Sequence, residues 1–154
     1  MDSPLHLLLL RIAILAASAF PIFYGVCAMI SGRLVLKVSA MLSGAKGNIS
    51  PEIDYLLKPL GIYIFMYGLL FAYAATDPVH YRVVVIWGAF VLLMRGVQRT
   101  ALTRKLNQMF HITESTNIAH GIYLIALSSA ILLLSVDAHA VPLYRRIANQ
   151  LALF

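Results

Sequence analysis

Apolar runs of membrane-spanning length dominate the pattern of this chain. Residues 12–30 form nineteen residues without a charge, residues 59–76 form eighteen, and residues 115–136 form twenty-two. An α-helix needs about 20 predominantly apolar residues to cross the roughly 30 Å hydrocarbon core of a bilayer. Each of these three runs therefore predicts a transmembrane helix.

A fourth apolar run is shorter and has an arginine at each end. Only twelve residues separate Arg82 from Arg95, about 18 Å of helix at 1.5 Å per residue. The preceding Asp77-Pro78 pair is typical of a helix start, with Asp as N-cap and Pro at the first helical position. A helix from Pro78 to residue 97 or 99 is long enough to cross, because arginines near its ends can extend to the headgroups.

The fold class follows from these runs. We predict an all-α polytopic membrane protein, a single domain over residues 1–154 whose four transmembrane helices form two hairpins. The first helix is expected to be retained rather than cleaved as a signal peptide, because its apolar run continues past the small residues. Apolar residues at helical spacing after Pro142 predict a short amphipathic helix at the C-terminus. The four predicted spans lie near 5–31, 57–76, 78–99 and 115–136.

Composition agrees with lipid as the main solvent. The chain is 61% hydrophobic and 12% charged, and Cys27 is its single cysteine. One cysteine excludes an intramolecular disulfide and any cysteine-based zinc or iron–sulfur site. The net charge of +6 lies on loops beside apolar runs, without the aromatic interleaving of a nucleic-acid patch. We therefore expect anionic lipid headgroups or acidic protein surfaces as partners, and no nucleic acid.

The distribution of basic residues predicts an orientation. Four spans place both termini on one side, with four basic residues, and the two long loops on the other side, with eight. The positive-inside rule then places the loops in the cytoplasm and both termini outside, in an inner or plasma membrane. The eight basic residues of the loop side are Arg33, Lys37, Lys46, Lys58, Arg95, Arg99, Arg104 and Lys105.

The two halves of the chain carry similar signals. Gly-Ile-Tyr at 61–63 recurs at 121–123, and Asp77 recurs as Asp137, both at an offset of sixty. Residues 5–76 and 78–136 are thus predicted to be one hairpin used twice, with parallel topology in the membrane.

Small residues form a stripe on the second predicted span. Gly61, Gly68 and Ala72 allow another helix to approach closely, which serves either packing inside the bundle or a seam with a partner. Packing inside the bundle is the more common use of such a stripe.

The spans contain little that could carry chemistry. No carboxylate, lysine or arginine lies near the middle of any predicted span, where ion-coupled transporters and proton pumps place them. We expect no enzymatic activity and no catalytic residue. His120, about six residues into the last span, is the candidate cofactor ligand, because a single axial histidine can hold a haem or a chlorin. A structural histidine bonded to a neighbouring loop or to Asn117 is the more common alternative.

A set of Asp and His residues lies on the predicted outer face. Asp77 with His80 and Asp137 with His139 offer ligands suited to zinc or another divalent metal. The alternative is structural, with Asp77 as an N-cap and Asp137 in an exit loop, and this alternative is favoured.

A basic segment follows the third predicted span. Arg95, Arg99, Arg104 and Lys105 can bind anionic lipid at about 1 kcal/mol per residue, or an acidic surface of another subunit.

Features from residues 49 to 99 resemble small four-helix membrane proteins of the DoxX-like type. Asp54, Gly61, Asp77-Pro78, Arg82 and Arg95 stand where that pattern has an acidic residue, a Gly-containing span, a turn and closing arginines. The resemblance implies a four-helix membrane protein, and some such proteins resemble subunits of quinone-linked oxidoreductases.

These observations predict a non-catalytic accessory or assembly subunit of a larger membrane complex, respiratory or photosynthetic. A small oligomeric transporter or channel, and a haem- or chlorin-holding bundle using His120, are the alternatives. The sequence indicates no particular cofactor.

Overall fold

The structure is a computed structural model that describes residues 4–44 and 49–151, with side chains described up to Ser135 apart from residues 4, 43, 109 and 110. It is all-α, and no strand occurs in these ranges. The elements are α1 (Pro4–Ile30), α2 (Gly32–Ser43), α3 (Pro51–Ala74), α4 (Arg82–Ala101), α5 (Thr103–Phe110) and α6 (Glu114–Leu151). Four stretches are long and apolar enough to cross a membrane: Leu5–Ile30, Pro51–Ala74, Arg82–Ala101 and Glu114–Ser135. The prediction of an all-α protein with four spans is confirmed.

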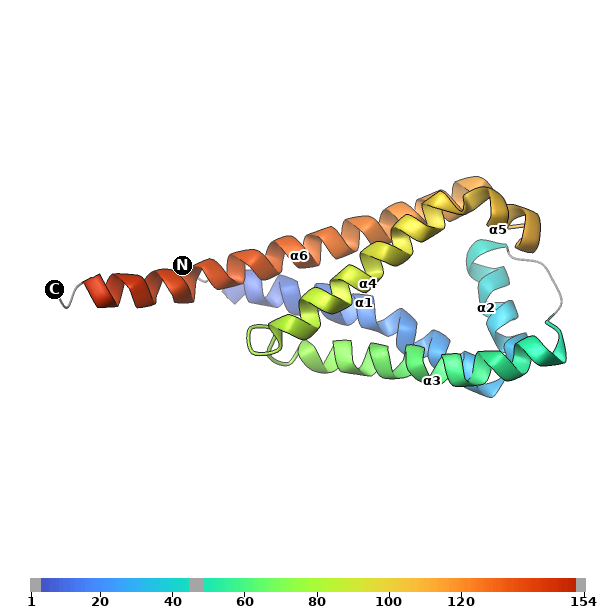
Figure 1. Cartoon of the computed structure of the whole chain (residues 1–154), viewed down its shortest axis with the longest axis horizontal. Coiled ribbons are helices and arrows are strands. Elements are labelled where there is room, and N and C mark those ends of the chain that lie inside the picture. The colour runs from blue at the N-terminus through green and yellow to red at the C-terminus, as the bar shows by residue number, and fades with distance from the viewer. Residues whose placement is uncertain (1–3, 45–48, 152–154) are drawn as a thin grey trace.

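The spans pack as two hairpins. α1 packs along α3, and α4 packs along α6. Along the chain, the short helix α2 connects α1 to α3, and the short helix α5 connects α4 to α6. The hairpins meet where α3 turns into α4 and diverge toward the end that carries α2 and α5 (Figure 1). We call this the loop end, and the opposite end, where α1 begins, the terminal end. Both halves share this order of elements, whereas the internal sequence repeat stays a prediction.

α3 begins earlier than its apolar run suggests. The predicted start was residue 57, but the helix begins at Pro51, where the Ser50 hydroxyl accepts a hydrogen bond from the Ile53 N–H at 3.4 Å. Proline at the first position and acidic residues in the first turn favour this start. The apolar run misplaced the boundary because a transmembrane helix continues through the charged headgroup region.

α4 begins later than predicted. Asp77 and Pro78 do not start it: they begin a separate turn, in which the Asp77 carboxylate accepts from the His80 N–H at 3.1 Å. The Asp77 carbonyl accepts from the Tyr81 N–H at 3.0 Å, and α4 then begins at Arg82. Asp77 therefore caps one turn rather than the span, and Arg82 is the first residue of α4.

α6 is longer than the predicted span. The predicted C-terminal helix exists, but it is the continuation of α6, which runs unbroken through Pro142. Asp137 lies in this helix and not in an exit loop, so that part of the prediction is wrong. Pro21 in α1 and Pro59 in α3 also lie inside helices. Proline removes one backbone hydrogen bond, and in membrane helices neighbouring groups can satisfy the carbonyl that is left free.

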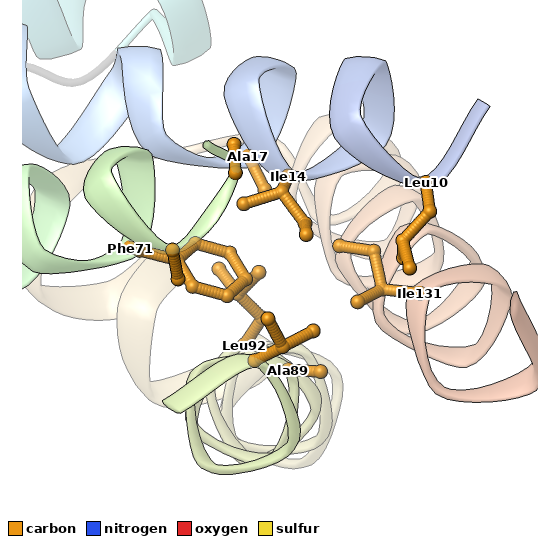
Figure 2. Packing of buried hydrophobic residues seen from close by; sticks show 10 residues of the cluster. Leu10, Ile14, Ala17, Phe71, Ala89, Leu92 and Ile131 are labelled. Carbon is orange, nitrogen blue, oxygen red and sulfur yellow. The ribbon is translucent and has the colours of Figure 1, made fainter. Parts of the chain in front are cut away.

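The main core lies in the half of the bundle near the terminal end. The Phe71 ring of α3 lies between side chains of α1 and side chains of α4, and Leu10 meets Ile131 of α6 (Figure 2). Phe71 is 1% exposed and packs directly against Gly88, where any side chain would collide with the ring. This contact holds α3 against α4.

Glycines set the closest helix crossings. At Gly25, an added Cβ would lie 2.6 Å from the Phe65 backbone nitrogen. At Gly61, it would lie 2.8 Å from the Met29 backbone nitrogen. A second crossing joins Gly96 of α4 to Gly121 of α6. Within each hairpin, the two long helices therefore approach each other closely at their backbones, as small residues permit in membranes.

Candidate functional site

A buried polar cluster joins α4, α5 and α6 at the loop end. The Arg99 Nε donates to Asn117 Oδ1 at 2.9 Å. Asn117 Nδ2 donates to the Arg99 carbonyl at 2.7 Å and to Thr103 Oγ1 at 3.0 Å. Asn117 is fully buried and Thr103 is 6% exposed. The amide of Asn117 thus fixes the orientation of the Arg99 guanidinium.

His120 lies one turn beyond Asn117 on α6. Its Nδ1 atom is buried and has no hydrogen-bond partner among the described residues. Asn117 is engaged with Arg99 and Thr103, so it is not the partner that the sequence suggested as the structural alternative for His120. His120 and Tyr24 of α1 lie within electrostatic range of Arg99. The role of His120 as a cofactor ligand stays a prediction.

Arg95 lies on the same side of α4 as Arg99. Arg95 follows Gly88 by seven residues, and Arg99 follows Arg95 by four. Both spacings return to nearly the same face of a helix. Gly88, on the same line of α4, packs against the Phe71 ring of α3. Arg95 is exposed and interacts electrostatically with Tyr67 of α3 and with Arg99. We call Arg95 and Arg99 the arginine pair.

The arginine pair has no carboxylate partner in the part of the chain that the structure describes. The ion pair found there joins Lys58 to Asp54 at 3.8 Å, on α3. Arg104 and Lys105, predicted to act with the pair, are exposed on α5. The sequence-predicted basic segment is therefore divided into two groups, because the chain turns at Leu102 between α4 and α5.

An apolar groove runs between α3 and α4. It encloses about 230 Å³, and its lining includes Tyr67, Leu70 and Phe71 of α3 with Val83, Trp87 and Val91 of α4. The Tyr67 hydroxyl donates to the Gly88 carbonyl at 2.8 Å, so the polar group that faces the groove is already bonded. The groove can therefore accept hydrocarbon without leaving a polar group unsatisfied.

The terminal end carries the predicted metal ligands. Asp77 and His80 are exposed, and the His80 ring lies edge-on to Tyr81 with centroids 4.7 Å apart. Tyr81 shares a hydrogen bond of 3.0 Å with Tyr73, and this bond raises the pKa of Tyr81. Within the described residues, no three His, Cys, Asp or Glu side chains gather to hold a metal ion. The side chains of Asp137 and His139 lie outside the described part, so the metal site stays a prediction.

The predicted stripe of small residues faces α1. Gly61 approaches Ala28 and Gly25, Gly68 approaches Ile22 and Pro21, and Ala72 is half-buried. These two glycines are used inside the chain, which is the alternative favoured by the sequence.

Sequence reasoning missed two polar residues. Thr103 and Asn117 were not expected to bond to Arg99, although Asn117 is a polar side chain inside a predicted span and was a usable signal. Asp54 accepts a hydrogen bond from the Gly32 N–H and thereby ties the start of α2 to α3.

Known proteins do not identify the chain. Comparison with protein-family models, curated proteins and solved structures finds no match. The resemblance to DoxX-like proteins therefore stays a prediction, and function has to be argued from the structure.

Proposed function

We propose that this chain is a non-catalytic accessory or assembly subunit of a larger membrane complex, respiratory or photosynthetic. One observation carries the proposal: α6 has 38 residues, about 57 Å of helix at 1.5 Å per residue, whereas the apolar run that is predicted to cross the membrane ends at residue 136, before Asp137. The last turns of α6 project beyond the start of α1, with no other described helix beside them (Figure 1).

A helix of this kind needs a surface to pack against. In proteins, most of the stability of a helix comes from packing of its apolar face against other elements. Leu143, Ile147 and Leu151 recur at helical spacing in this extension, which predicts one apolar face. A neighbouring subunit would cover that face and stabilise the extension.

The spans themselves support a structural role. Ser18 and Ser128 are buried, and each donates to a backbone carbonyl of its own helix, at 2.8 and 2.9 Å. Such back-bonded hydroxyls satisfy themselves without a ligand. The buried amide of Asn117 likewise bonds to α4 and α5 and serves the packing of the helices.

We expect the chain to co-migrate with a complex much larger than its own 17.0 kDa after extraction in a mild detergent. Ile147→Asn should release the chain from the complex, because it places an amide on the apolar face of the extension. Native gel migration and native mass measurement would show both results. Ala148→Asn is the matched control, since it adds the same amide about 100° around the helix, and it should stay bound.

Other outcomes would favour the alternatives. A homo-oligomer of this chain alone would support a transporter or channel, and a visible chromophore would support a cofactor-holding bundle. A monomer that gives neither result would contradict the accessory role.

The proposal includes the orientation in which the loop end faces the cytoplasm. Met41 is 88% exposed on α2, and Gln108 is exposed on α5. In a Cys27→Ala background, cysteines at these two positions should react with a membrane-impermeant maleimide in inverted vesicles and not in intact spheroplasts. Labelling of both from the outside would reverse the orientation.

A further inference from the structure

The α3–α4 groove lies in the half of the spans nearest the terminal end. Along α4, its lining runs from Val83 to Val91, about 1.5 to 14 Å from Arg82, whereas the whole helix has 20 residues, about 30 Å. Along α3, the lining reaches Phe71, and the helix ends soon afterwards, at Ala74. The groove therefore extends from the headgroup level of the terminal end to about the middle of the membrane.

We propose that this groove is a binding site for one acyl chain of a phospholipid in the leaflet at the terminal end. Each leaflet contributes about half of the roughly 30 Å hydrocarbon core, about 15 Å of acyl chain. The lining on α4 extends over about 12 Å, from Val83 to Val91, so its length matches one chain. The headgroup would lie beside the turn between α3 and α4, and the end of the chain would lie near Val91.

The lining of the groove is suited to hydrocarbon rather than to water. Its floor is buried and consists of the Phe71 ring and Gly88, whereas Leu70 and Trp87 of its walls are 55% and 63% exposed. The Tyr67 hydroxyl already donates to the Gly88 carbonyl at 2.8 Å, which leaves the indole N–H of Trp87 as the free polar group of the lining side chains. An ordered water needs two to four polar partners, so a hydrocarbon chain fits this groove better.

The size of the groove favours a single acyl chain over a helix of another protein or of a second copy. The groove encloses about 230 Å³, whereas an α-helix with its side chains is about 10–12 Å across. The contact between Phe71 and Gly88 joins α3 to α4 along the floor, so the groove cannot widen to admit a helix without breaking this contact. A chain in the groove would give its lining the dispersion contacts that an empty groove lacks.

The charges near the mouth of the groove predict no selectivity for the headgroup. The turn before α4 carries one acidic residue, Asp77, and α4 begins with one basic residue, Arg82. The hydroxyls of Tyr73 and Tyr81, which share a hydrogen bond of 3.0 Å, add no charge. The site would therefore bind phospholipids through a chain and not through a headgroup. It is separate from the arginine pair at the loop end and does not depend on whether the protein joins a complex.

Fluorescence of Trp87, the single tryptophan of the chain, tests the site directly. The delipidated protein in a mild detergent is titrated with phosphatidylcholine that carries bromine atoms halfway along its acyl chains, because bromine quenches indole fluorescence on contact. We expect quenching to saturate at about one lipid per protein. Phosphatidylglycerol with the same brominated chains should give the same curve. A clear preference for either headgroup would overturn a site that binds through the chain.

Moving the tryptophan gives the matched control. In the double variant Trp87→Phe with Phe23→Trp, the indole lies on α1, at a position that is 55% exposed and outside the groove. Its quenching should rise in proportion to the fraction of brominated lipid in the micelles, without saturation at one lipid. Saturation at the same ratio in both proteins would overturn the groove as the site. Weaker quenching in the wild type than in the double variant would also overturn it, in favour of a protein surface that covers the groove.

A second pair of variants fills the groove and keeps Trp87 as the reporter. Val91→Phe should raise the lipid concentration needed for half-maximal quenching about tenfold, because excluding two methylenes from an apolar site is enough for that change. Met94→Phe adds a ring at an exposed position of the same helix outside the lining and should leave the curve unchanged. Equal curves for the two variants would show that the chain lies elsewhere. Folding of every variant is checked from the reactivity of Cys27, which is 5% exposed in the folded chain.

Discussion

Replacing Gly25 with alanine should destabilise the protein, although alanine is the better helix former. In helices, glycine is less favourable than alanine by about 1 kcal/mol, so helix propensity by itself predicts a gain. The structure predicts the opposite sign, because the added Cβ would lie 2.6 Å from the Phe65 backbone nitrogen and 2.8 Å from its Cα. Backbone cannot rotate away as a side chain can, so α1 and α3 must separate. We expect a net loss of about 1–3 kcal/mol.

Thermal unfolding measured with a thiol-reactive dye would show this loss. Cys27 is the single cysteine and is buried, so the dye reports the temperature at which the α1–α3 packing opens. Ala19→Leu is the control: it adds a larger side chain to the same helix at an exposed position and should leave the midpoint unchanged. A raised midpoint in the Gly25→Ala protein would mean that α1 and α3 do not cross closely at this residue.

Replacing Asn117 with leucine should cost about 2–4 kcal/mol of folding free energy, mainly because it leaves the Arg99 guanidinium without its buried acceptor. Leucine has a similar size but cannot accept from Arg99 Nε or donate to Thr103 Oγ1, the two contacts of 2.9 and 3.0 Å that join α6 to α4 and α5. Asn117→Asp keeps the acceptor for Arg99 and loses both donors, so we expect a loss between those of leucine and the wild type.

The midpoint of thermal unfolding, followed by circular dichroism at 222 nm, would rank these variants. Asn107→Leu makes the same exchange at a half-buried position on α5 and should lower the midpoint little. If Asn117→Leu were as stable as the wild type, the amide would not hold Arg99, and the orientation of the arginine pair would have to come from elsewhere.

The candidate site shows how far sequence reasoning reaches. Arg95 and Arg99 could be singled out from the sequence because charged residues beside an apolar run are expensive in a membrane and therefore informative. Their separation from Arg104 and Lys105 could not, because it depends on the turn at Leu102 that starts α5 in a new direction. The contact of Arg99 with Asn117 spans eighteen residues of sequence, and no local pattern predicts that the two side chains meet.

Two helix boundaries were misplaced for different reasons. At α3, charge marks where hydrocarbon ends, but the helix begins several residues earlier, at Pro51. At α4, the Asp77-Pro78 pair has the residues of a helix start, but the helix begins at Arg82. The Ser50 cap extends α3 into the headgroup region, whereas Asp77 closes a separate turn before α4.

The sequence by itself determined that four helices are long and apolar enough to cross a membrane, because this depends only on the length of each apolar run relative to the thickness of the hydrocarbon core. It also determined that no carboxylate, lysine or arginine lies near the middle of any predicted span. Only the tertiary structure decided which faces meet: that Gly25 lies against α3, that Gly88 admits the ring of Phe71, and that Arg99 bonds to Asn117. Each of these depends on the rotation of one helix against another, which is set by contacts between residues far apart in the chain.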